Sequence, residues 1–118
     1  MTATHVLAVV PVSDLDVSAP WFERFFGTGP TNIPMPGILA EWRVTDDGWV
    51  QVTVDAGRAG SGLLNVAVDD LVASIADLES RGIAVSPITE ANKGVRLAPV
   101  RDPDGNTITL IGGFREDY

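Results

Sequence analysis

The chain alternates short apolar runs with two amphipathic stretches, and this pattern predicts its elements. Apolar residues at every second position are typical of half-buried strands, whereas apolar residues three or four apart are typical of helices. In the first half, the apolar run over residues 5–12 predicts a strand. A helix follows, with Trp21, Phe22, Phe25 and Phe26 on its apolar face.

The start of this first helix is ambiguous because Pro20 cannot sit in a helix interior without the loss of a hydrogen bond. Ser13 and Asp16 have the spacing of a capping box. Ser18 as the N-cap would instead place Pro20 in the first turn, where proline is tolerated. We favour the second interpretation, which predicts a helix over residues 19–26.

Gly27 is expected to close the helix. The next stretch, residues 28–37, contains three prolines and predicts either an irregular connection or a weak edge strand. Residues 38–44 and 49–54 then predict a hairpin that turns at Asp46-Asp47-Gly48.

The second half repeats this succession. Val12-Ser13-Asp14-Leu15 ends the first apolar strand, and Val68-Asp69-Asp70-Leu71 ends a similar strand 56 residues later. Gly82 is expected to end the second helix. The elements predicted in this half are a helix over residues 71–81 and strands over residues 62–68, 84–88, 94–100 and 107–112.

Each half therefore reads as a strand, a helix and three further strands. A module of about 56 residues buries too little surface to be stable alone, so we expect the two to pair. The predicted organisation is a single domain over residues 1–118. It comprises a first module over about 4–55, a linker over 56–60, a second module over about 61–113 and a tail over 114–118.

The last predicted strand follows a tight polar turn, Asp102-Pro103-Asp104-Gly105-Asn106. Proline fixes one backbone angle, the aspartates can bond nearby backbone amides, and glycine supplies a conformation that most residues avoid. Together with Val12-Ser13-Asp14-Leu15-Asp16, Trp21-Phe22-Glu23 and Val68-Asp69-Asp70-Leu71, this turn resembles the vicinal-oxygen-chelate superfamily. That superfamily includes glyoxalases, bleomycin-resistance proteins and extradiol dioxygenases. The resemblance covers residues 5–113 and implies an α+β fold. In that fold, two βαβββ modules form a curved, incomplete barrel around a cleft, as in glyoxalase/bleomycin resistance proteins.

Composition and charge narrow the function classes. Sixteen acidic and eight basic residues give a formal net charge of −8, which argues against nucleic acid or an anionic membrane as a partner. No run approaches the ~18 apolar residues of a membrane span, and no basic region precedes the first apolar run as in a signal peptide. The chain has no cysteine, which fits a reducing compartment and excludes thiolate catalysis. We therefore expect a cytoplasmic protein.

The resemblance also implies where a metal would bind. Metal-using members of the superfamily draw one ligand from each of four strands, and these positions fall at Leu7, Gln51, Leu63 and Thr109. Leucine cannot coordinate a cation, and neutral oxygens bind divalent ions weakly without carboxylates. We therefore expect no metal and no other cofactor.

His5 is the only histidine and lies two residues before the first of these positions. A β-bulge would be needed to bring it into the site. A site of two histidines and one carboxylate would still lack its second imidazole, unless a dimer supplied it. We expect His5 to be half exposed or bonded to a backbone carbonyl.

Alternation along the strands identifies the residues that face a cleft. If Val50 and Val52 pack beneath the helices, Trp49 and Gln51 point the opposite way. Trp42 is expected in the core. Trp49 could cap the core instead of stacking on a ligand, and Glu41 and Arg43 could be solvated on an edge strand. The residues predicted to bind a ligand are His5, Glu41, Arg43, Trp49, Gln51, Leu63, Asn65 and Thr109.

Three function hypotheses follow, of which we favour the first. The first is a metal-independent protein of the glyoxalase/bleomycin-resistance type that binds or sequesters a small organic ligand in its cleft. The alternative is a lyase, isomerase or dioxygenase-like enzyme with an unusual metal site, or with Glu41 as general base. A third interpretation is a degenerate member that acts through protein contacts. Pairing along exposed strand edges would protect those edges, so we also expect a homodimer.

Overall fold

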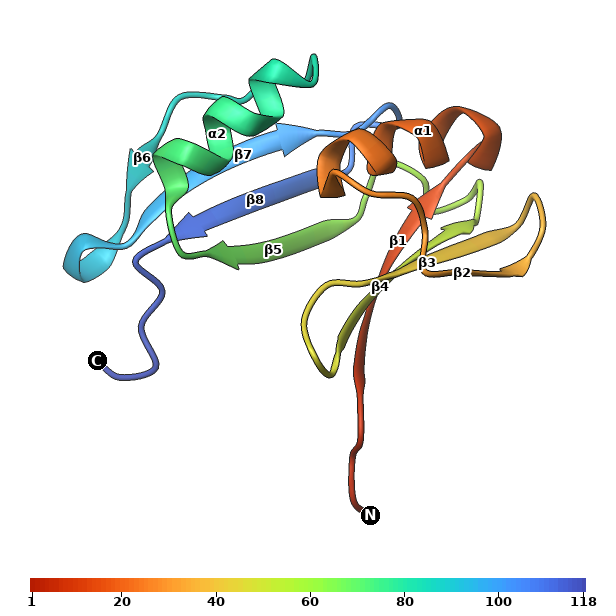
Figure 1. Ribbon diagram of the computed structural model, residues 1–118, viewed down its shortest axis with the longest axis horizontal. Helices are drawn as coiled ribbons and strands as arrows, with labels where there is room; N and C mark the ends of the chain where they lie inside the picture. Colours follow the sequence, from red (N-terminus) through yellow and green to blue (C-terminus); the bar gives the residue numbers. More distant parts are fainter.

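Two four-stranded mixed sheets, each carrying one helix, make up the computed structural model, which describes residues 1–118 (Figure 1). The first sheet has the order β1 (Val6–Val12), β4 (Gly48–Val54), β3 (Leu39–Arg43), β2 (Asn32–Met35). The second has the order β5 (Leu63–Val68), β8 (Thr107–Gly112), β7 (Arg96–Arg101), β6 (Thr89–Glu90). The helices are α1 (Leu15–Phe26) and α2 (Leu71–Ser80), and a short 3-10 turn, η1 (Asn92–Gly94), precedes β7.

The two sheets have the same topology. In each, the first strand of the module pairs in parallel with the last, and the other pairs are antiparallel. The β1–β4 register is unbroken from Val6 opposite Gly48 to Val12 opposite Val54. The predicted α+β fold of two βαβββ modules is therefore confirmed, and the sheets do not close into a barrel.

The start that we favoured for α1 is wrong. The helix runs without interruption from Leu15, and the N-cap is Asp14, whose carboxylate accepts a hydrogen bond from the Asp16 amide at 2.9 Å. Pro20 lies inside the helix on its exposed side, so water can solvate the carbonyl that loses its partner. Burial of Leu15 in the core favours the longer helix despite this loss. The predicted end is confirmed, because Gly27 has φ 75° and donates to the Glu23 carbonyl.

The strand predicted over residues 84–88 is also wrong. This stretch is irregular apart from one bond to β7, from the Ser86 amide to the Pro99 carbonyl. Pro87 has no amide hydrogen to contribute to a ladder, and the regular pairing is limited to the two residues of β6. Within residues 28–37, the weak edge strand is the alternative that occurs, as β2.

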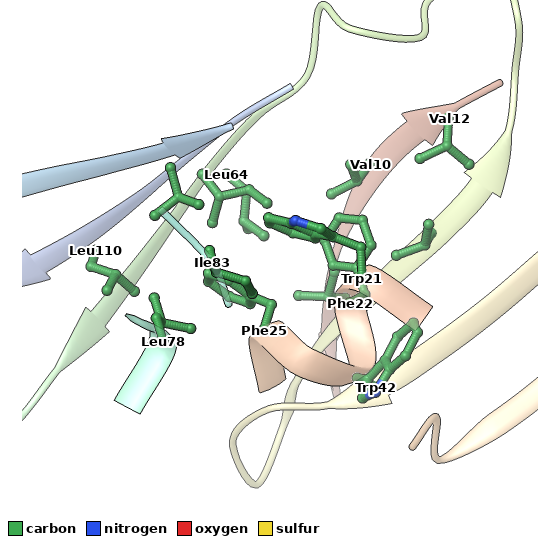
Figure 2. Packing of buried hydrophobic residues seen from close by; sticks show 14 of the residues in the cluster. Val10, Val12, Trp21, Phe22, Phe25, Trp42, Leu64, Leu78, Ile83 and Leu110 are labelled. Carbon is green, nitrogen blue, oxygen red and sulfur yellow. The ribbon is translucent and has the colours of Figure 1, made fainter. Parts of the chain in front are cut away.

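The core is shared by both modules. Alternate residues of β1 and β4, including Val10 and Val52, face α1, whose Phe22 is fully buried. Figure 2 shows Trp21, Phe22 and Phe25 of α1 between residues of the first sheet and residues of the second module. The second-module side of this cluster contains Leu64, Leu78, Ile83 and Leu110. Trp42 is buried as predicted, and its indole donates to the Thr28 carbonyl at 2.9 Å.

The turn over residues 102–106 joins the modules. Asn106 is fully buried, and its Oδ1 accepts hydrogen bonds from the amides of Gly60 (3.0 Å) and Gly62 (2.7 Å). Its Nδ2 donates to the Pro11 carbonyl (2.7 Å) and to Asp102 Oδ2 (2.8 Å). One side chain of the second module therefore fixes both the end of β1 and the linker.

The two aspartates of this turn have different roles. Asp102 accepts from the amides of Asp104 and Asn106, as predicted for a local turn bond. Burial raises the pKa of the Asp102 carboxyl above its ordinary value, against the opposing effect of the hydrogen bonds from Asn106. Asp104 instead accepts from the hydroxyl (2.5 Å) and the amide (3.1 Å) of Ser13 in the first module.

Candidate functional site

The inner edges of both sheets are free. β1 pairs only with β4, and β5 pairs only with β8. The end of β1 and the start of β5 approach closely, because a Cβ built on Gly62 would lie 2.9 Å from Pro11 Cδ. From this point the two strands diverge (Figure 1).

A cavity of about 480 Å³ occupies the space where β1 and β5 diverge, and we name it the intersheet trough. Most of its lining is apolar, and its polar side chains are few. The lining residues are Val6, Ala8, Val44, Thr45, Gly48, Trp49, Val50, Leu64, Asn65, Val66, Ala67 and Val68. An apolar cavity with few polar groups is the usual character of a small-molecule site.

Two of the residues predicted to bind a ligand line the trough. Trp49 is half-buried, and its indole nitrogen is inaccessible to solvent and has no hydrogen-bond partner. Asn65 is exposed at the trough and pairs in register with Thr109 on β8, so the two share one face of the second sheet. The site therefore offers an aromatic wall and one solvated amide.

Glu41 and Gln51 come together on the first sheet. They are register partners on β3 and β4, and the Gln51 Nε2 donates to Glu41 Oε2 at 2.9 Å. The other carboxylate oxygen accepts from Asn32 Nδ2 at 3.2 Å. Asn32 was missed from the sequence because residues 28–37 carry no regular pattern, although it lies opposite Glu41 in the β2–β3 pairing.

The remaining predicted residues do not join either group. The Arg43 guanidinium donates to the Asp46 carbonyl at 2.8 and 3.0 Å and lies 3.9 Å from its carboxylate. His5 precedes β1, is exposed, and has its Nδ1 3.0 Å from the Thr4 hydroxyl. Leu63 is 84% exposed.

The positions at which the resemblance implies metal ligands do not fit a cation. The side chains of Leu7 and Leu63 offer no donor atom, and Gln51 supplies only a neutral amide oxygen. Thr109 supplies a neutral hydroxyl. No three histidine, cysteine, aspartate or glutamate side chains gather anywhere in the structure.

Solved structures of other proteins have the same architecture. A glyoxalase/bleomycin resistance protein from Catenulispora acidiphila superposes with a TM-score of 0.86 and 24% identity, over 93% of this chain and 98% of that chain. TnmS3, an antibiotic-binding protein from Streptomyces sp. CB03234, superposes with a TM-score of 0.79 and 28% identity, over 95% and 98% of the two chains. The fold is that of the vicinal-oxygen-chelate superfamily.

A bleomycin-binding protein in complex with bleomycin has the same fold, with a TM-score of 0.75 and 21% identity, over 96% of this chain and all of that chain. No protein-family model and no curated protein matches the sequence. Neither helix is long and apolar enough to cross a membrane.

Proposed function

We propose that this protein binds a small organic ligand in the intersheet trough without a metal ion. The observation that carries the proposal is an apolar cavity whose wall includes the aromatic side chain of Trp49 and whose edge carries the Asn65 amide. Removal of apolar surface from water contributes about 25 cal/mol per Å², so a ligand that packs against this wall gains free energy on binding. The cavity of about 480 Å³ has the size of known ligand pockets.

Two proteins with the same fold bind small organic molecules, and this supports the proposal. One is an antibiotic-binding protein and the other holds bleomycin. The metal-independent part rests on the side chains at Leu7, Gln51, Leu63 and Thr109, which supply no carboxylate and no imidazole. The trough would therefore hold its ligand by apolar contact and by hydrogen bonds to the Asn65 amide.

We also propose a homodimer, formed along the free edges of β1 and β5. Unpaired strand edges readily accept a further strand, and Val6 and Leu63 on these edges are 73% and 84% exposed. A partner chain there would cover this apolar surface and narrow the trough. The absence of cysteine and the net charge of −8 support a cytoplasmic setting.

The test of binding is thermal unfolding of the full chain with bleomycin and with a panel of planar aromatic compounds. A ligand that binds only the folded chain raises Tm, and the stabilisation grows with the logarithm of the ligand concentration once that exceeds Kd. We expect Trp49→Phe, which removes part of the aromatic wall of the trough, to reduce the shift. Trp21→Phe, in the core and away from the trough, serves as the matched control and is compared with its own ligand-free Tm.

Two results would contradict the proposal. One is the absence of any shift across the panel. The other is a shift that Trp49→Phe and Asn65→Ala leave unchanged, since the ligand would then bind elsewhere. The homodimer is tested separately by sedimentation at several concentrations, where a monomer throughout would refute it.

A further inference from the structure

A second cavity lies on the helix-covered side of the second sheet, between α1 and α2. It has a volume of about 180 Å³, and we name it the interhelical pocket. Six apolar side chains form its walls: Phe25 and Phe26 from α1, Leu78 from α2, and Val66, Val68 and Leu110 from the sheet. Figure 2 shows Phe25, Leu78 and Leu110 on the three elements that surround this space.

One arginine that lines the pocket connects the two helices. Arg81 follows α2, and its guanidinium donates from Nε to the Arg24 carbonyl and from Nη2 to the Phe25 carbonyl at 3.3 Å. These carbonyls belong to the last turn of α1, which has no intrahelical donors for them. Arg81 therefore ties the end of α2 to the end of α1 and fixes the spacing of the two helices.

The polar rim of the pocket offers acceptors. Asp77 lies one turn before Arg81 and lines the pocket, but its carboxylate takes part in no hydrogen bond and no ion pair. The Ser74 hydroxyl donates to the Asp70 carbonyl, which leaves its lone pairs available. The Arg81 guanidinium is turned toward α1, lies within 4 Å of the Gly27 position and donates to two carbonyls there.

We propose that the interhelical pocket binds a small primary amine with an aromatic or branched aliphatic body. An engineered apolar cavity of about 150 Å³ admits benzene, so the walls here accommodate one ring. An ammonium group at the rim would meet the unpaired Asp77 carboxylate and the Ser74 hydroxyl. The pocket shares Val66 and Val68 with the intersheet trough, but neither Trp49 nor Asn65 lines it, so variants of those two residues distinguish a failure of this proposal from a failure of the function proposed for the trough.

The experiment is a titration of the full chain with benzylamine at pH 7, followed by amide chemical shifts in NMR spectra. Toluene and phenylacetate are the matched probes, because they keep the ring and remove or invert the charge. We expect benzylamine to shift amides of Phe25 and Leu78 and to bind about five-fold more tightly than toluene, as befits a partly solvated charge pair. Phenylacetate should bind more weakly than toluene.

Two variants locate the site. Asp77→Asn keeps the shape of the side chain and should bring the benzylamine affinity down to that of toluene. Glu79→Gln removes a carboxylate from the same helix but outside the pocket, and should leave the affinity unchanged. Ser74→Leu fills the cavity and should abolish binding of both compounds, while its circular dichroism verifies the fold.

The proposal is overturned if toluene and benzylamine bind equally in the parent chain, or if phenylacetate binds as tightly as the amine. It is also overturned if folded Ser74→Leu still binds benzylamine, since the amine would then occupy another site.

Discussion

Replacement of Asn106 by alanine tests the connection between the two modules. The variant keeps the backbone of the turn but removes an amide that makes four hydrogen bonds. Its partners are the amides of Gly60 and Gly62, the Pro11 carbonyl and the Asp102 carboxylate. All four lose a partner at once, and only the Asp102 carboxylate keeps other donors in the turn, the backbone amides of Asp104 and Asn106.

The magnitude follows from the burial of these groups. An unsatisfied buried polar group costs about 1–3 kcal/mol, and three of the four bonds are only partly buried, so we take about 1 kcal/mol for each. The expected loss is therefore about 4 kcal/mol. A small domain has a free energy of unfolding of about 5–15 kcal/mol, so this is a large fraction of the total.

The assay is urea unfolding at pH 7, monitored by circular dichroism. With a slope of about 2 kcal/mol per molar urea, the midpoint should fall by about 2 M. Asn92→Ala is the matched control, because Asn92 is exposed and its side chain makes no hydrogen bond, and it should change stability by less than about 0.5 kcal/mol. A loss below about 1 kcal/mol for Asn106→Ala would refute the reasoning, since the amide would then not hold the modules together.

Three further predictions concern the turn and α1. Burial raises the pKa of Asp102, so this carboxyl binds a proton more tightly in the folded chain than in the unfolded chain. Its contribution to the free energy of unfolding therefore falls as pH rises from about 4 through its folded pKa. The difference in urea midpoint between the parent chain and Asp102→Asn should therefore move against the parent chain as pH rises. A difference that moves in favour of the parent chain would contradict the raised pKa. Gly62→Ala would place a Cβ 2.8 Å from Asn106 Oδ1 and should cost about 2 kcal/mol in the same assay, whereas Gly57→Ala, whose Cβ would meet nothing closer than 3.8 Å, should be nearly neutral. Pro20→Ala restores the missing amide of α1 on its exposed side and should raise the free energy of unfolding by about 2 kcal/mol, and a decrease would show that the proline is favourable there.

The local pattern of apolar and polar residues predicted most helices and strands correctly, but it failed for the start of α1 and for residues 84–88. Strict alternation predicted β4 and β8, because one face of each strand is buried and the other is not. The start of α1 was wrong because the penalty of Pro20 is local, whereas the burial of Leu15 that outweighs it depends on the tertiary structure. Residues 84–88 have a strand-like composition, but only one of their amides finds a partner on β7.

The sequence predicts those contacts of the candidate site that lie within one sheet, but not those that depend on how the two sheets are placed. Glu41 and Gln51 meet because they are cross-strand neighbours, a relation that follows from the hairpin. The intersheet trough depends on how β1 and β5 diverge, and no pattern in either strand encodes that angle. The Asn106 contacts join residues 44 and 95 positions apart, and their signal in the sequence was only the turn itself.

Asn106 comes later in the sequence than Pro11 and Gly62, and this order has a consequence during protein synthesis. A ribosome releases the Pro11 carbonyl and the Gly62 amide well before Asn106, which follows Gly62 by 44 residues. At 5–20 residues per second this interval lasts about 2–9 s. Throughout it, the first module has no completed second module to pack against, and the apolar residues of α1 that later meet Leu64 and Leu110 are open to chaperones or to another nascent chain. The modules are thus joined only after Asn106 near the end of the chain has been synthesised. Ribosomal pausing between Gly62 and Asn106 would prolong the time in which the unfinished chain can aggregate.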